Sequence, residues 1–119
     1  MRAFNQNRQT EIADSVMVAD TFRSRLRGWL GRDEVNIGEG LWIVPSRAVH
    51  TRGMIFPIDI LFLDRTFRVV AAEENMSPGR MTRFWWRART VLELPAGTLR
   101  RTGTCVGDQI QMRQPKERS

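Results

Sequence analysis

Short apolar runs recur along most of the chain, and residues that favour turns separate them. Pro45 and Pro57 are two of these breaks, and Pro-Gly, Pro-Ala-Gly and Gly-Asp steps supply others. Such punctuation predicts strands that end in turns. Residues 10–19 also have strand-type content, with Ile12 and Val16 an even number of positions apart. The strands predicted further along the chain are 41–44, 48–51, 58–63, 67–72, 89–94 and 109–112.

One segment near the N-terminus has the period of a helix instead. Its apolar residues share one helical face and are Phe22, Leu26, Trp29 and Leu30. Asp20 is suited to cap the start of this helix, and Gly31 is suited to end it. Gly28 weakens its interior. We therefore expect one main helix, with Trp29 packed in the core.

Two local features can also be placed from the sequence. Residues 64–66 are suited to a turn between two antiparallel strands, and the segment 95–112 has room for a short helical turn before the last strand. About six or seven strands with one main helix predict an α+β protein. We expect a single domain over residues 10–112, built on a curved, barrel-like and mostly antiparallel sheet. The polar residues 1–9 and 113–119 are expected to form flexible tails.

The composition is that of a globular protein and does not indicate an activity. The chain has 119 residues, of which 41% are hydrophobic and 27% charged, as in ordinary globular proteins. No apolar stretch approaches the roughly 20 residues of a membrane-spanning helix, and the N-terminal residues do not resemble a signal peptide. Cys105 is the single cysteine, so neither a disulfide within the chain nor a cysteine-rich metal site is expected. We expect a soluble cytoplasmic protein without a cofactor.

The basic residues offer one functional alternative. Eighteen of the nineteen are arginine, and the formal net charge is +6. A positive protein attracts polyanions, and arginines beside aromatic rings can stack on nucleic-acid bases. No standard nucleic-acid-binding motif is present, so this possibility is not favoured. The two arginine clusters are Arg23, Arg25, Arg27 and Arg32, and then Arg80, Arg83, Arg87 and Arg89 around Trp85 and Trp86.

Two carboxylates interrupt otherwise apolar strands. Asp59 lies in a run that is apolar on both strand faces, and Glu93 lies between leucines. A buried carboxylate without a partner costs several kcal/mol, about 3 or more. Each residue either binds backbone donors or an arginine to fix the fold, which is the stronger alternative, or faces a shared pocket suited to acid–base chemistry.

His50 is the only histidine and the best functional candidate. It stands in a short polar segment, VHTRGM, with Thr51, Arg52 and Met54 nearby. In a ligand site His50 would form a hydrogen bond and Arg52 would attract an anion. Catalysis or metal binding would require Asp59 or Glu93 to converge on His50, because no nucleophile motif is present.

Four segments in order support a family resemblance. They are RGWLGR (27–32), GLWIVPSRAVHTRGMIFPIDILFLD (40–64), RVVAAEENMSPGR (68–80) and TVLELPAGTLRRTGTCVGDQI (90–110). Together they resemble the bacterial and archaeal family called domain of unknown function 192, over roughly residues 12–112. The chain departs from the family pattern at VHTRGM and GWLGR, where many members look like WMKNT and GLMFR. The resemblance implies a compact β-rich single domain with barrel-like curvature, and it does not imply an activity because the family is uncharacterised. Many relatives look exported or membrane-attached.

We therefore expect a small binding or assembly module rather than an enzyme. The expected site is the surface of His50, Thr51, Arg52 and Met54, and its partner is a protein or a small anionic ligand. Asp59 and Glu93 would support it. No catalytic residue and no metal ligand is assigned. The alternatives are a hydrolase-type or metal-assisted enzyme, and a polyanion-binding protein.

Overall fold

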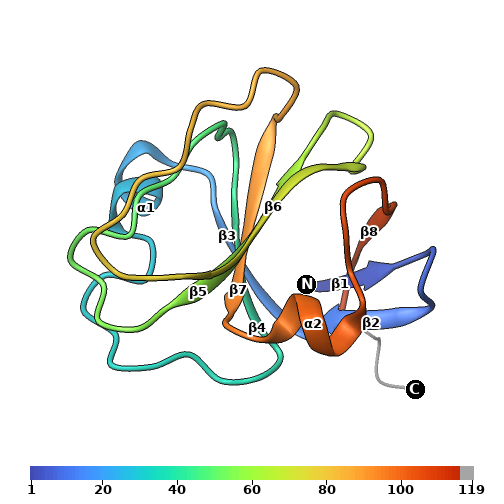
Figure 1. Cartoon of the computed structure of the whole chain (residues 1–119), viewed down its shortest axis with the longest axis horizontal. Coiled ribbons are helices and arrows are strands. Elements are labelled where there is room, and N and C mark those ends of the chain that lie inside the picture. The colour runs from blue at the N-terminus through green and yellow to red at the C-terminus, as the bar shows by residue number, and fades with distance from the viewer. Residues whose placement is uncertain (116–119) are drawn as a thin grey trace.

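The chain folds as an α+β domain, as the sequence predicts (Figure 1). The computed structural model describes residues 1–115. Within this range it has eight strands and two short helices, compared with the six or seven strands and one main helix expected. The strands form two sheets that do not close on each other, so the domain is barrel-like only loosely. In order, the elements are β1 (Arg2–Asn5), β2 (Thr10–Ala13), β3 (Ser15–Ala19), α1 (Phe22–Arg27), β4 (Glu39–Ile43), β5 (Ile58–Leu63), β6 (Val69–Met76), β7 (Thr90–Pro95), α2 (Thr98–Thr102) and β8 (Ile110–Arg113).

The larger sheet has five strands in the order β3-β4-β7-β5-β6. Its neighbouring strands are antiparallel except for the parallel pair β3 and β4. Every residue of β5 and β7 is buried. These two central strands are apolar on both faces because both faces of the sheet are covered. β5 and β6 form the antiparallel pair predicted on either side of residues 64–66.

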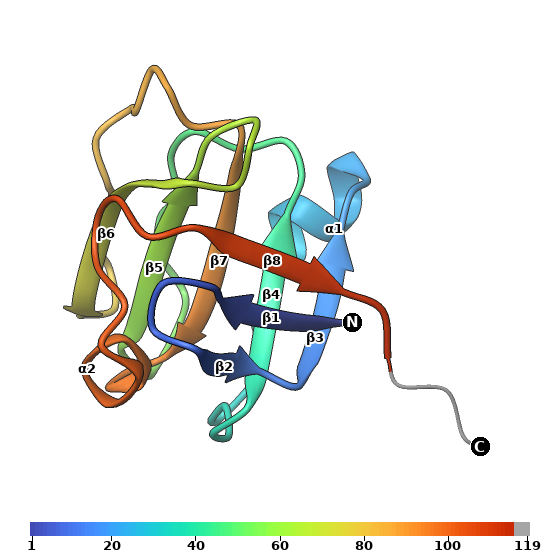
Figure 2. The ribbon, with the colours of Figure 1, turned by 90° about the vertical axis from the view of Figure 1, so that its right-hand side faces the viewer.

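The smaller sheet has three strands in the order β2-β1-β8 and lies against one face of the larger sheet (Figure 2). An apolar cluster fills the space between the sheets, with Ala3 of β1, Ile12 of β2 and Ile110 of β8 facing Leu61 and Leu92. The chain segment 1–9, expected to be a tail, thus provides the central strand of this sheet. Arg113 belongs to β8, and residues 116–119 of the expected C-terminal tail lie outside the described residues.

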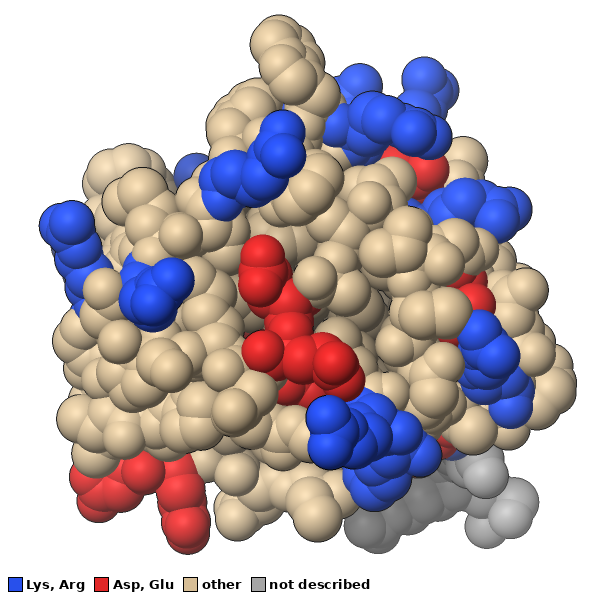
Figure 3. Space-filling model, in the orientation of Figure 1, with Lys and Arg blue, Asp and Glu red and all other residues tan. Residues whose placement is uncertain are grey.

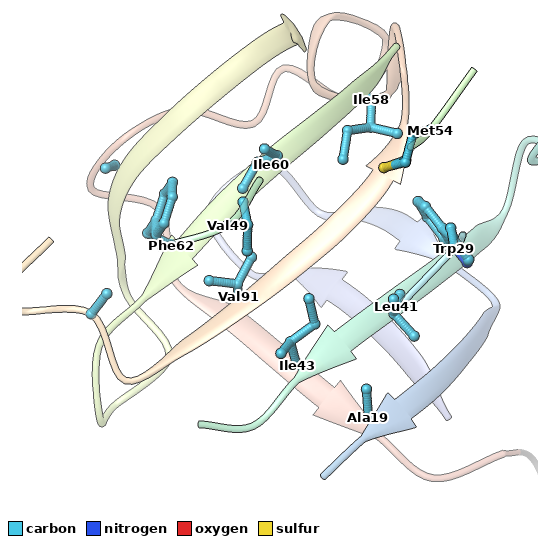
Figure 4. Close-up of a cluster of buried hydrophobic side chains, with 12 residues drawn as sticks. Ala19, Trp29, Leu41, Ile43, Val49, Met54, Ile58, Ile60, Phe62 and Val91 are labelled. Carbon is cyan, nitrogen blue, oxygen red and sulfur yellow. The ribbon is translucent and has the colours of Figure 1, made fainter. Parts of the chain in front are cut away.

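The opposite face of the larger sheet carries a second apolar cluster (Figure 4). Leu41, Ile43, Ile60 and Val91 project from the strands, and Trp29 packs over them from the segment after α1. Loops rather than a third sheet cover this face. A pocket can therefore form on this face, because loops leave gaps that paired strands would close.

Helix α1 is shorter than the apolar stripe predicts. Thr21 caps it instead of Asp20: the Thr21 hydroxyl accepts a hydrogen bond from the Ser24 amide, and Ser24 reciprocates. The helix ends at Gly28, whose φ of 47° is costly for other residues, rather than at Gly31. Of the predicted stripe only Trp29 is buried, because the chain leaves the helical path before it.

Two further predictions have different outcomes. The short helical turn expected in the segment 95–112 is confirmed as α2, between Gly97 and Gly103. The strand expected at 48–51 is wrong, since this segment makes a single isolated bridge between His50 and Met81. Its backbone hydrogen bonds go to the β6–β7 connection instead, as when the Thr82 amide donates to the Val49 carbonyl.

Candidate functional site

A pocket lies between α1 and the outer face of the larger sheet. It encloses about 260 Å³ and opens partly to solvent. Its walls are mostly apolar and come from α1 and the residues just after it, the end of β4, the β4–β5 connection and one residue of β7. The side chains that line it include Phe22, Leu26, Trp29, Val49, His50 and Met54, together with Glu93.

Glu93 is the buried charged group of this pocket. In the sheet, β7 pairs Glu93 with Leu41 of β4 and Ile60 of β5, so all three side chains face the same side. The Glu93 residue is 4% exposed. Within residues 1–115 its carboxylate has no hydrogen-bond or ion-pair partner. Burial among apolar neighbours raises the pKa of Glu93 to about 7.

His50 and Met54 also line this pocket, whereas Thr51 and Arg52 do not. His50 is exposed at the opening, and Met54 is buried against the apolar cluster. The structure thus brings His50 and Glu93 to one cavity, without a hydrogen bond between them in the described part of the chain. Arg52 is exposed and does not line the pocket.

Thr51 is fully buried and holds two loops together. Its hydroxyl donates to the Ser77 carbonyl at 2.7 Å and accepts from the Arg80 amide at 2.9 Å. Its backbone amide donates to the Arg80 carbonyl. With its hydrogen-bonding groups occupied, Thr51 positions His50 and Met54 and is not itself available to a ligand.

The arginines of α1 frame the pocket. Arg25 and Arg27 line it, and neither pairs with a carboxylate among the described residues. The Arg25 Nη1 donates to the backbone carbonyls of Asp20 and Val44, each at 3.2 Å. Arg25 therefore links α1 to the residue that follows β4, at one side of the pocket.

Asp59 lies on the opposite face of the sheet from Glu93. It pairs with Leu94 in the register that pairs Ile60 with Glu93, and successive residues of a strand face opposite ways. Its two oxygens accept from the backbone amides of Asn75 (2.8 Å) and Leu99 (2.9 Å). Asp59 therefore binds backbone donors, the structural alternative given by the sequence, and the two carboxylates do not share a pocket.

Among residues 1–115, no three His, Cys, Asp or Glu side chains come together as a metal site would require. Neither helix of this part is long and apolar enough to cross a membrane. The sequence analysis missed the contribution of α1 to the pocket, because the helical stripe suggested a fully packed face. The signal that could have revealed it is Gly28, which breaks the stripe after two turns.

The fold and site define a small α+β domain with a ligand-sized pocket on one face. The chain belongs to the uncharacterised family of domain of unknown function 192, described as "Uncharacterized ACR", whose model matches residues 3–112. It is similar to a UPF0127 protein of Thermococcus sibiricus (strain DSM 12597 / MM 739), with 31% identity over 112 residues. The match covers 87% of this chain and 70% of that protein. The family carries no assigned activity.

Two crystal structures share the fold. One is a protein of unknown function from Novosphingobium aromaticivorans DSM 12444, with a TM-score of 0.84 and 21% identity, over 94% of this chain and 84% of that one. The other is provisionally described as a transcription regulator, from Sinorhizobium meliloti 1021. Its TM-score is 0.76 at 23% identity, over 92% of this chain and 89% of that one. At these identities the likeness concerns the fold alone.

Proposed function

We propose that this protein is a binding module for a small, mainly apolar molecule that occupies the pocket beneath α1. The observation that carries the proposal is the Glu93 carboxyl group, which is buried in an apolar pocket without a partner in the described structure. Such a group is costly in a folded protein unless another group satisfies it. A ligand that brings a hydrogen-bond donor would do so.

The pocket limits the chemistry of the ligand. A volume of about 260 Å³ suits a single ring or a short alkyl chain. Trp29, Val49 and Met54 provide apolar contact, and the Glu93 carboxylate accepts from an amine, amide or hydroxyl. We favour an amine, because a charge-assisted hydrogen bond is about twice as strong as a neutral one.

This proposal retains His50 and Met54 from the expected site and places them at the opening and the wall. It differs from the expected small anionic ligand, which Arg52, Arg25 and Arg27 would attract at the surface. We also favour a binding module over an enzyme. His50 and Glu93 share the cavity, but within residues 1–115 neither side chain forms a hydrogen bond that would orient it for acid–base catalysis.

A series of three phenyl probes tests the proposal: benzylamine, benzyl alcohol and benzoate. We expect benzylamine to bind best, and its affinity to rise between pH 6 and about 8 as Glu93 ionises. Chemical-shift changes at the Val49 and Met54 methyl groups measure binding in the pocket. Glu93→Gln should weaken benzylamine binding about 10- to 100-fold and remove its pH dependence.

The matched control is Glu73→Gln, because Glu73 is exposed and outside the pocket. It should leave all three affinities unchanged. The proposal is overturned if benzylamine binds the Glu93→Gln protein as well as the unmodified protein. Preferential binding of benzoate would support the anionic ligand instead.

A further inference from the structure

Three segments distant in sequence meet on one side of the molecule. They are residues 21–30, 44–57 and 80–89, which we call the arginine-rich face. The Arg25 Nη1 binds the Val44 carbonyl, and the Trp85 amide donates to the Arg47 carbonyl at 2.9 Å. Pro45 and Ser46 line both the pocket beneath α1 and a shallower hollow beside Phe84, so the surface is continuous. Figure 1 shows α1 and the two connections along its left and upper side.

The charge of this face is one-sided. Its three segments contain no Asp or Glu, and no ion pair of the described structure involves their arginines. Figure 3 shows blue and tan atoms along the left margin and at the upper left, while red atoms lie near the centre, at the lower left and at the upper right. Glu73 and Glu74 border the face at a hollow they share with Arg80 and Arg83. The arginines of the face are Arg23, Arg25, Arg27, Arg47, Arg52, Arg80, Arg83, Arg87 and Arg89.

The same face exposes apolar side chains. It holds seven of the eleven large hydrophobic residues that are exposed in the described structure. Trp86 is 80% exposed, more than any other of them, and its ring meets that of Phe84 edge-on at 5.7 Å. The seven are Phe22, Leu26, Leu30, Ile55, Met81, Phe84 and Trp86.

We propose that the arginine-rich face docks onto an anionic lipid bilayer. The guanidinium groups would bind lipid phosphates, and the exposed rings and aliphatic chains would enter the boundary between headgroups and acyl chains. Trp86 and Phe84 suit this depth, because aromatic rings favour the membrane interface. The inference does not rest on the proposed pocket ligand, although Phe22, Leu26 and Leu30 belong both to this face and to the lining of the pocket.

Two other occupants fit the face less well. A second copy would bring its own arginines against these, and like charges across an interface cost several kcal/mol in repulsion, about 2 or more. A single-stranded nucleic acid would engage Phe84 and Trp86 by stacking. It would not use Leu26, Ile55 or Met81, which have no aromatic face to stack. The mixture of aliphatic side chains with arginine therefore favours lipid.

Sedimentation with vesicles tests the inference. The protein should bind vesicles of equal parts phosphatidylglycerol and phosphatidylcholine, and only weakly those of phosphatidylcholine alone. The double variant Arg83→Ala/Arg87→Ala should bind about 25-fold more weakly, since each arginine near an anionic surface contributes about fivefold. The matched control is Arg100→Ala/Arg101→Ala, which removes the same charge from α2, outside the face, and should weaken binding far less.

Apolar variants separate lipid from nucleic acid. Ile55→Ala and Trp86→Ala should each weaken vesicle binding severalfold, whereas Ile37→Ala, exposed elsewhere, should not. Circular dichroism checks that each variant is folded. Equal binding to both vesicle types, or equal loss in the two double variants, overturns the inference. Binding to oligothymidylate that depends on Arg83 and Arg87 but not on Ile55, without vesicle binding, would replace it with nucleic acid. Glu93→Gln should leave vesicle binding unchanged, so this test and that of the pocket ligand fail separately.

Discussion

Glu93 lowers the stability of the folded protein at neutral pH, and it is also the buried carboxyl group of the pocket. Its pKa is raised from 4.5 to about 7 by burial, so the folded protein holds this proton more tightly than the unfolded chain. Below pH 4.5 both states are protonated and Glu93 costs nothing on that account. As the pH rises towards 7 the unfolded chain ionises first, and stability falls; above about pH 7 the loss is complete.

We therefore predict that Glu93→Gln is more stable than the unmodified protein at pH 8, by roughly 3 kcal/mol, and nearly equal to it at pH 4.5. Urea unfolding at the two pH values measures the difference. The same experiment on Glu73→Gln should show no such change between the two pH values. An equal effect of Glu93→Gln at both would mean that its carboxyl group is not buried as a charge.

Sequence reasoning could identify Glu93 and Asp59 as unusual but not assign their roles. Both interrupt apolar strands, and that signal is local. Their difference depends on strand register, which places one carboxylate towards α2 and the other towards the pocket. A shift of one position in the pairing of β5 with β7 would place both carboxylates on the same face of the sheet. The linear sequence does not contain that register, so the pocket could not be predicted.

At the level of elements, Asp59 of β5 also anchors the start of α2. Its bond to the Leu99 amide supplies the acceptor that Gly97, the N-cap residue, cannot provide through a side chain. Its other oxygen holds Asn75, which lies in the left-handed region with φ of 51°. One side chain thus joins three elements.

Asp59→Ala should lower the free energy of unfolding by about 3 kcal/mol, because the buried Leu99 amide and the partly buried Asn75 amide lose their carboxylate acceptor. Chemical denaturation measures the loss. Asp20→Ala is the comparison: the sequence suggested Asp20 as a helix cap, but Thr21 has that role, and the change should cost less than about 0.5 kcal/mol. If the two variants lose similar stability, the account of Asp59 as a helix anchor is wrong.

Strands with a strong hydrophobic pattern could be predicted from the sequence, whereas strands with a weak hydrophobic pattern could not. The predicted strand 58–63 matches β5, because its large apolar residues on both faces, with Asp59 as the one polar position, are typical of a strand buried on both sides. β1 has the sequence RAFN, in which only Ala3 and Asn5 are buried, and it forms because β2 and β8 pair with it. Tertiary pairing, rather than intrinsic preference, creates that strand.

For the whole molecule, a buried polar network fastens the beginning of the chain to its last turn. The Asp108 Oδ2 accepts from the Asn5 side chain (2.9 Å), the Cys105 amide (3.0 Å) and the Arg8 Nε (3.2 Å). Partial burial alone would raise the pKa of Asp108, but these hydrogen bonds and the charge of Arg8 together lower it. Its contribution to stability is therefore present above pH 3.8 and lost in more acidic solution.

Asp108→Ala should destabilise the domain by about 3 kcal/mol at pH 7, and by less at pH 2, because uptake of a proton in acid removes part of the carboxylate's contribution. Thermal unfolding at the two pH values checks this. Asp33→Ala, an exposed position without a partner in the described structure, should change neither value. Equal destabilisation by Asp108→Ala at both pH values would argue against a charged anchor.

The place of β1 between β2 and β8 has a consequence for synthesis. Of the eight strands, β1 leaves the ribosome first and its partner β8 leaves last. The early strand can form a hairpin with β2, but its other edge stays open until β8 emerges. The inner face of the larger sheet is also incompletely covered until then. Translation must therefore reach β8 before this domain can close, and until then β1 presents an unpaired edge.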